Sequence, residues 1–279
     1  MADCDYAKLV DALLFSVLAA GRVQLAHRRS GPVVSHKADA SPVTVADEQS
    51  EEILLAGLAR VMPGVAVVAE EAMSRGPAPV LGAEFFLVDP LDGTREYVKG
   101  SNDFCVNIAL IVDRRPAFGI IYAPAKRSFY ATLGAGKAIE ADISTDAGPA
   151  RLADCAMRPL RTRSPDPDAL TAIASRSHHR AATEAFLNGL SIAGRTHIGS
   201  ALKFCVIARG DADIYPRFGA INEWDTAAGH AILTASGGCV TTASGQDLGY
   251  GKLEAAFLNP PFVAWGRREL VRPFSAGGP

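Results

Sequence analysis

Regularly spaced apolar residues at the start of the chain predict two helices. Between residues 5 and 28, apolar side chains recur every three or four positions, which places them on one face of a helix. The Gly-Pro pair at 31–32 ends this helix. The small, polar stretch 37–44 predicts a loop, and a second helix follows over 46–60 with Thr44 as its N-cap.

Short apolar runs predict a group of strands in the middle of the chain. They cover 65–69, 84–88, 104–112, 117–122 and 128–133. Charged or proline-containing turns separate the last three runs, which predicts an antiparallel meander. The Gly- and Pro-rich stretch 74–81 predicts a surface loop.

Predicted strands and helices alternate after a proline-rich, linker-like segment over 158–168. The strands cover 170–175, 191–197, 213–215 and 256–258, and the helices cover 181–190, 201–209 and 224–235. Such alternation is typical of α/β organisation. The sequence therefore predicts a mixed α/β protein with an α+β N-terminal half over 1–150 and an α/β C-terminal half over 151–279.

Composition changes this picture by excluding several classes of protein. The chain has 279 residues, of which 48% are hydrophobic, so it can bury a sizeable core and is neither disordered nor stapled by disulfides. Its formal net charge is −2. A nucleic-acid-binding domain usually carries a basic excess or stripe, so this charge argues against a polynucleotide partner.

Cysteine usage and the N-terminus predict a cytoplasmic protein. The five cysteines are scattered without C-x-x-C spacing, which predicts reduced, mostly buried thiols rather than a zinc or redox site. The longest apolar stretches, Leu9–Ala20 and Phe104–Val112, contain Asp11 and Asn107 and are too short to span a bilayer. The acidic N-terminus does not fit a signal peptide.

Two carboxylates at the end of a predicted strand are the first candidates for chemistry. The strand over 84–88 is followed by Asp89 and Asp92, and Gly93-Thr94 then opens a predicted helical turn over 92–98. Unpaired backbone N–H groups at such a turn bind phosphate well. A divalent cation would remove the repulsion between phosphate and the two aspartates, and hard oxygen ligands favour Mg²⁺. The alternative is a simple turn in which Asp92 is an N-cap.

Further acids lie at the ends of other predicted elements. Glu70-Glu71 follows the strand over 65–69, Asp225 opens a helix, and Asp47 begins the second helix. Taken singly, each acid is better explained as a helix cap or a solvated side chain. Taken together, they place carboxylates where α/β proteins build their sites.

Four strings in this order resemble the signature of the inositol monophosphatase superfamily. They are Lys37–Asp47, Glu70-Glu71, Asp89–Thr94 and Trp224–Gly229. The resemblance implies a layered αβαβα sugar-phosphatase-like fold and a lithium-sensitive, Mg²⁺-dependent phosphomonoesterase. It also implies two to three Mg²⁺ ions in a cleft between the two halves.

Three more strings resemble one branch of this superfamily, the 3′(2′),5′-bisphosphate nucleotidases of the bacterial CysQ type. They are Ser175–His178, Gly199–Cys205 and Tyr215–Gly219. The resemblance implies hydrolysis of adenosine 3′,5′-bisphosphate (PAP) to AMP and phosphate, and of its sulfated relative PAPS. An inositol or other sugar monophosphatase is the alternative. A catalytically dead nucleotide-binding regulator fits less well, because none of the expected acidic ligands is missing.

The resemblance also implies a role for each matching residue. Glu70, Asp89, the carbonyl of Leu91, Asp92 and Asp225 would bind the metals, and most of them would also contact substrate. Gly93 and Thr94 would hold the scissile phosphate, and Asp47, Glu70 and Thr94 would activate the attacking water.

The second phosphate and the nucleoside require a separate group of contacts. The resemblance implies His178, Ser200, Lys203 and Arg217 for this role, and the planar guanidinium of Arg217 suits bidentate phosphate binding. The alternative for Arg217 is a surface ion pair. Because the superfamily includes monomers and homodimers, and allows peripheral attachment to the inner membrane, the oligomeric state and membrane association stay open.

Overall fold

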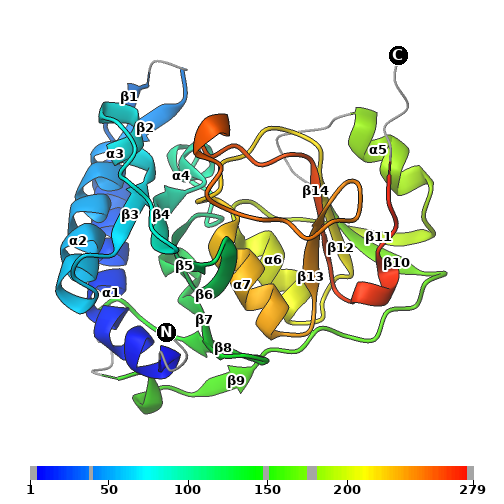
Figure 1. Cartoon of the computed structure of the whole chain (residues 1–279). Helices are drawn as coiled ribbons and strands as arrows, with labels where there is room; N and C mark the ends of the chain where they lie inside the picture. Colours follow the sequence, from blue (N-terminus) through cyan, green and yellow to red (C-terminus); the bar gives the residue numbers. More distant parts are fainter. Residues whose placement is uncertain (1–4, 38–39, 147–150, 175–180, 275–279) are drawn as a thin grey trace.

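Five alternating layers of helices and sheets make up the protein (Figure 1). The computed structural model describes residues 5–37, 40–146, 151–174 and 181–274. The helices are α1 (Tyr6–Ser30), α2 (Val45–Val61), α3 (Glu70–Arg75), α4 (Thr94–Val98), α5 (Ala181–Asn188), α6 (Leu202–Ala208) and α7 (Ala227–Ala235). Short 3-10 helices lie at Pro124–Lys126, Leu152–Asp154, Leu253–Ala255 and Arg268–Leu270. α1 and α2 form one outer layer, α6 and α7 lie between the two large sheets, and α5 lies beyond the second sheet, which confirms the predicted αβαβα order.

A seven-stranded sheet separates α1 and α2 from the middle helices. In spatial order it contains β3 (Ala66–Ala69), β4 (Glu84–Asp92), β5 (Cys105–Val112), β6 (Arg115–Ala123), β7 (Ser128–Gly134), β8 (Lys137–Asp142) and β9 (Met157–Pro159). β3 and β4 are parallel, and every later pair is antiparallel, so the predicted meander is confirmed. β8 and β9 were not expected from the sequence.

The strands of this sheet are apolar on both faces because helices cover both faces. Along β4, Phe86 and Val88 pack in one cluster with α1 and α2, whereas Phe85 and Leu87 pack in another with α6 and α7. Successive side chains of a strand point to opposite faces, so one continuous apolar run serves both clusters. The sheet also packs closely on α7, since a Cβ on Gly119 of β6 would lie 2.4 Å from a backbone oxygen of α7.

The second sheet has five strands and mixed direction. In spatial order it contains β11 (Ile192–His197), β10 (Leu170–Ala174), β12 (Ile214–Arg217), β14 (Phe262–Trp265) and β13 (Cys239–Thr242). The first three correspond to predicted strands. The strand predicted over 256–258 is wrong, because Ala256 and Phe257 have positive φ angles of 49° and 58° that no extended strand can include.

A small hairpin replaces part of the loop predicted over 37–44. β1 (Val34–His36) pairs with β2 (Pro42–Thr44), so the last three residues of that stretch are extended. α2 then begins as predicted, with the side chain of Thr44 accepting a hydrogen bond from the backbone N–H of Ala46. The loop predicted over 74–81 starts slightly later, because α3 continues to Arg75.

α1 is, among the described helices, the one long and apolar enough by length and composition to cross a membrane. From the sequence, the apolar stretch Leu9–Ala20 is too short to span a bilayer. The helix that contains it is longer, because it continues to Ser30. In the structure 56% of its most apolar window is buried, mainly against α2 and the first sheet, as in a core helix. The described cysteines are all free, and Cys105, Cys205 and Cys239 are buried.

Candidate active site

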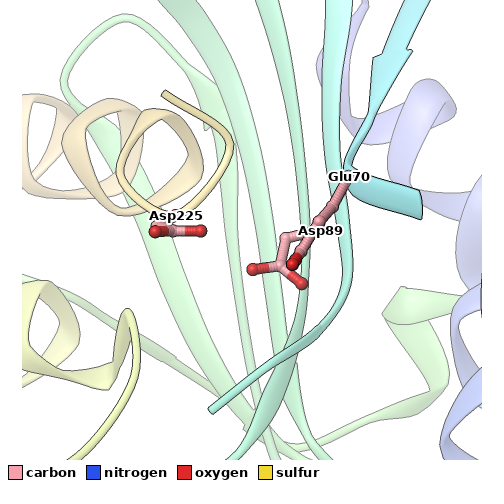
Figure 2. Close-up of side chains that lie close together, drawn as sticks. All are labelled: Glu70, Asp89 and Asp225. Carbon is pink, nitrogen blue, oxygen red and sulfur yellow. The ribbon is translucent and has the colours of Figure 1, made fainter. Parts of the chain in front are cut away.

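Three carboxylates converge from three different elements (Figure 2). Glu70 begins α3 directly after β3, Asp89 lies in β4, and Asp225 lies just before α7. Each offers an oxygen, and these oxygens all lie within 4.8 Å of one another. The parallel pairing of β3 with β4 brings Glu70 next to Asp89, and packing of α7 on the same sheet brings Asp225 to them.

The chain turns at Gly93, between the end of β4 and the start of α4. β4 continues four residues beyond its predicted end, with an irregular register between Asp89 and Asp92. Gly93 then adopts a positive φ of 92°, and a Cβ there would lie 2.7 Å from the backbone oxygen of Asp103. A residue with a side chain would therefore disturb this turn, which places Thr94 at the start of α4.

Asp89 and Asp225 have strongly perturbed acidities. Burial raises the pKa of Asp89 well above its usual value, and the charges of Glu70, Asp92 and Asp225 raise it further. Burial, Asp92 and Glu70 raise the pKa of Asp225 in the same way. Oxygens of these two aspartates and of Glu70 lie within 4.8 Å of one another, so the repulsion between their charges favours a proton in the cluster. A divalent cation suits this all-oxygen cluster, because it can replace the proton and neutralise the ionised carboxylates.

Asp92 lies beside the cluster in a different environment. Burial raises its pKa to about 6, although Lys203, the backbone N–H of Ala201 and the Asn107 amide all favour the ionised form. Asn107 Nδ2 lies 3.3 Å from Asp92 Oδ2. Sequence reasoning gave Asn107 no role, but a polar residue in the middle of the apolar run 104–112 was an available signal.

Asp47 and Thr94 form a hydrogen-bonded pair next to the carboxylate cluster. Oδ2 of Asp47 accepts hydrogen bonds from the backbone N–H and hydroxyl of Thr44, at 2.8 and 2.6 Å. The Thr94 hydroxyl oxygen lies 3.1 Å from Asp47 Oδ1 and 3.1 Å from the carbonyl oxygen of Leu91. Burial raises the pKa of Asp47 to about 6.

Lys37 contacts the acids of α3 and was not assigned a role from the sequence. Its Nζ lies 2.6 Å from Glu70 Oε1 and 2.7 Å from Glu71 Oε1. Burial alone would lower the pKa of Lys37, but the two carboxylates outweigh burial and raise it. Burial raises the pKa of Glu71 to about 7. Lys37 therefore holds Glu70 and Glu71 in place through two ion pairs.

A cavity of about 400 Å³ adjoins the carboxylates. Six of the residues predicted for the site line it, namely Asp92, Gly93, Ser200, Lys203, Arg217 and Asp225. The cavity therefore joins the end of β4, the start of α6 and the end of β12. Of the remaining predicted residues, Glu70 and Asp89 form the carboxylate cluster with Asp225. The Thr94 hydroxyl contacts Asp47 and the carbonyl of Leu91. His178 lies outside the described residues.

The two cationic side chains of the cavity are held in different ways. Lys203 is buried, and its Nζ donates a hydrogen bond to the carbonyl of Ser200 at 2.9 Å. Arg217 donates from Nη2 to the carbonyl of Ala220 at 3.0 Å, a backbone group rather than the carboxylate of a surface ion pair. Its Nε is buried and has no partner among the described residues. A buried donor of this kind is available to an anionic ligand.

Comparisons with known proteins show which family and fold the chain resembles. The model of the inositol monophosphatase family matches residues 5–269. The 3′(2′),5′-bisphosphate nucleotidase CysQ of Escherichia coli K12 is 40% identical over 230 residues, covering 82% of this chain and 87% of that protein. The structure of CysQ from Bacteroides thetaiotaomicron superposes with a TM-score of 0.76 and 33% identity, covering 93% and 97% of the two chains. The extragenic suppressor protein suhB from Bartonella henselae, at 21% identity, shares the fold with a TM-score of 0.74 over 94% and 95%.

Proposed function

Because the chain belongs to the inositol monophosphatase family, we propose that it is a Mg²⁺-dependent 3′(2′),5′-bisphosphate nucleotidase. Its substrate would be adenosine 3′,5′-bisphosphate, hydrolysed to AMP and phosphate, with PAPS as a second candidate. The names of relatives about 40% identical over most of the chain support this substrate class.

The observation that carries the proposal is the distribution of charge around the cavity. Asp92 and Asp225 line it beside the carboxylate cluster, and Lys203 and Arg217 line it as well. A bisphosphate has two anionic groups and needs both features, whereas a monophosphate has no use for a second cationic subsite. The free Nε of Arg217 and its planar guanidinium suit the non-scissile phosphate.

Glu70, Asp89, Asp92, Asp225 and the carbonyl of Leu91 would hold the Mg²⁺ ions. When bound, Mg²⁺ neutralises phosphate charge and makes water more acidic. The donors on this chain are carboxylate and carbonyl oxygens, which is the set that Mg²⁺ prefers.

Thr94 and Asp47 would orient the attacking water. The Thr94 hydroxyl has a single proton, and Asp47 Oδ1 and the Leu91 carbonyl are both within reach of it. When that proton is engaged in a hydrogen bond to one of these acceptors, the hydroxyl oxygen can still accept a hydrogen bond from water. An ionised Asp47 would strengthen its hydrogen bond from the Thr94 hydroxyl and so make the hydroxyl oxygen a better acceptor. Glu70, at the start of α3, would help to activate the same water. Gly93 and Thr94 would hold the scissile phosphate through backbone N–H groups, with Ser200 and His178 as nucleotide contacts.

Turnover of PAP and of inositol 1-phosphate at equal Mg²⁺ concentration tests the proposal. We expect a clear preference for PAP, and loss of turnover after chelation of the metal. Arg217→Ala should raise the KM for PAP and leave that for inositol 1-phosphate nearly unchanged. Arg127→Ala is the matched control, because Arg127 is exposed and pairs with Asp142 away from the cavity. A preference for inositol 1-phosphate would favour the sugar monophosphatase alternative, and binding of PAP without turnover would favour a regulator.

The cellular location proposed here is the cytoplasm. Free, mostly buried thiols fit a reducing compartment. Cell fractionation would separate this location from peripheral attachment to the inner membrane, and analytical ultracentrifugation would separate a monomer from a homodimer.

A further inference from the structure

A buried carboxylate lies two residues before Asp225 and has no role in the proposed chemistry. Glu223 has no exposed surface. It accepts hydrogen bonds from the backbone N–H groups of Gly251 and Lys252, at 2.7 and 3.0 Å. Lys252 Nζ lies 2.6 Å from Glu223 Oε1. All these donors belong to one short loop segment, so a single carboxylate fixes that segment to the chain before α7.

The backbone of Glu223 shapes the turn that carries Asp225. Its carbonyl accepts hydrogen bonds from the N–H groups of Thr226 and Ala227, at 3.1 and 3.0 Å. Its own N–H donates to the carbonyl of Phe257 at 2.8 Å. One residue therefore anchors both the turn around Asp225 and the loop of Phe257.

A second residue of the same loop completes the attachment. The backbone N–H of Asn259 donates to the carbonyl of Ile221 at 2.9 Å, and its side-chain amide reaches the Thr226 hydroxyl at 2.9 Å. The Asn222 N–H in turn donates to Asp225 Oδ2 at 3.3 Å. Segments 221–226 and 251–259 are thus joined at both ends.

The joined segments contribute to both functional regions of the site. Leu258, next to Asn259, lines the cavity together with Ile221 and Asn222. Asp225 belongs to the carboxylate cluster. Hydrogen bonds to an ionised acceptor are the strong ones, and a buried carboxylate that loses its donors is unfavourable. The hydrogen bonds of Glu223 therefore fix the position of Leu258, which lines the cavity, relative to Asp225.

We propose that Glu223 is a positioning residue, which sets the orientation of Asp225 for the metal and the position of Leu258 for the nucleotide. It acts through the loop at Gly251 and Lys252 and does not touch substrate. The nucleotide part rests on the proposed function, whereas the metal part can be measured without any substrate.

Mg²⁺ binding to Glu223→Gln tests this role, measured by calorimetry and by the Mg²⁺-induced rise in Tm. Both oxygens of Glu223 face donors, so the amide group of Gln must lie against a backbone N–H or the Lys252 ammonium and weaken the attachment. We therefore expect Mg²⁺ affinity to fall roughly 10- to 100-fold, the usual effect of losing a group that orients a metal ligand. The KM for PAP should rise as well. Glu140→Gln is the matched control, because Glu140 is a buried carboxylate paired with Arg158 and Arg209 on the far strand β8.

Equal Mg²⁺ affinity in Glu223→Gln and Glu140→Gln, with a similar loss of Tm, would overturn the proposal and leave Glu223 a purely structural role. If Glu223→Gln does not fold, Glu223→Asp gives the same test, since it keeps the charge but draws the carboxylate back by one methylene from the N–H groups of Gly251 and Lys252. Unchanged Mg²⁺ affinity in that variant would equally overturn the proposal. Wild-type protein that binds Mg²⁺ but does not hydrolyse PAP would refute the proposed function, and the calorimetric comparison would still decide the role of Glu223.

Discussion

Replacement of Asp47 by Asn should stabilise the metal-free protein at pH 8 while it removes most of the activity. Asp47 is 1% exposed, and burial raises its pKa to about 6. An Asn can keep every hydrogen bond of the native residue. Its carbonyl oxygen can accept from Thr44 in place of Oδ2, and its amide can donate to the Thr94 hydroxyl, whose proton then goes to the carbonyl of Leu91.

The expected gain follows from the difference in pKa between the folded and unfolded protein. From the ordinary value of 3.8 to about 6, the difference corresponds to about 3 kcal/mol. Because the folded pKa is the higher one, the protonated form favours folding. This contribution is complete below about pH 3.8 and is lost as the pH rises through about 6. A negative charge in the first turn of α2 is worth about 0.3–1 kcal/mol, so the net gain for Asn at pH 8 is about 2 kcal/mol.

Thermal unfolding in the presence of a chelator measures this gain. At pH 8 the Tm of Asp47→Asn should exceed that of the wild type by roughly 4 °C. At pH 5 the gain should shrink by about 1.4 kcal/mol, because the wild-type carboxyl is then largely protonated in the folded protein. Turnover of PAP with saturating Mg²⁺ should fall about 100-fold or more, since a general acid–base group is lost.

Two results would refute this reasoning. A lower Tm for Asp47→Asn at pH 8 would mean that the ionised carboxylate stabilises the metal-free fold. A Tm difference that is independent of pH between 5 and 8 would mean that the substitution acts through packing rather than through charge. Thr44→Val is a useful companion variant, because it removes one donor to Asp47 and should destabilise the protein at both pH values.

Three further predictions concern the metal ligands and the core. Asp89→Asn should abolish turnover and keep the circular dichroism spectrum of the wild type, and retained Mg²⁺-dependent turnover would contradict the metal assignment. Mg²⁺ should raise the Tm more at pH 8 than at pH 5.5, because the raised pKa values of Asp89 and Asp225 make protons compete with the metal as the pH falls. An equal rise in Tm at the two pH values would argue against binding at these carboxylates. Gly119→Ala should destabilise the protein by about 1–3 kcal/mol, because the new Cβ would lie 2.4 Å from the Ala228 carbonyl oxygen. Urea unfolding measures this loss, and an unchanged midpoint would mean that α7 can shift away from the sheet without cost.

Much of the first sheet could be predicted from the sequence because its strands are long and apolar on both faces. The meander β5–β7 follows directly from runs such as Phe104–Val112 separated by charged turns. The C-terminal strands were harder, since β13 and β14 have four residues each and their register depends on partners far along the chain. The apolar run at 256–258 resembled a strand, and only the positive φ angles of Ala256 and Phe257 exclude one.

The site shows a similar division between local pattern and tertiary contact. The resemblance of the ordered acidic strings to the superfamily signature selected Glu70, Asp89 and Asp225, which the structure brings together. The ion pairs of Lys37 with Glu70 and Glu71 link residues more than 30 positions apart, and no spacing in the sequence specifies them. The attachment of Glu223 to Lys252 was hidden for the same reason.

The middle layer of helices has a consequence for synthesis of the chain. Glu70 and Asp89 come from the first third of the sequence, whereas Asp225 precedes α7, which packs between the two sheets. The first sheet can therefore leave the ribosome with only part of its acidic cluster. Glu70, Asp89 and Asp225 can therefore act together as ligands only after the segment around Asp225 has been made and α7 has docked on the first sheet.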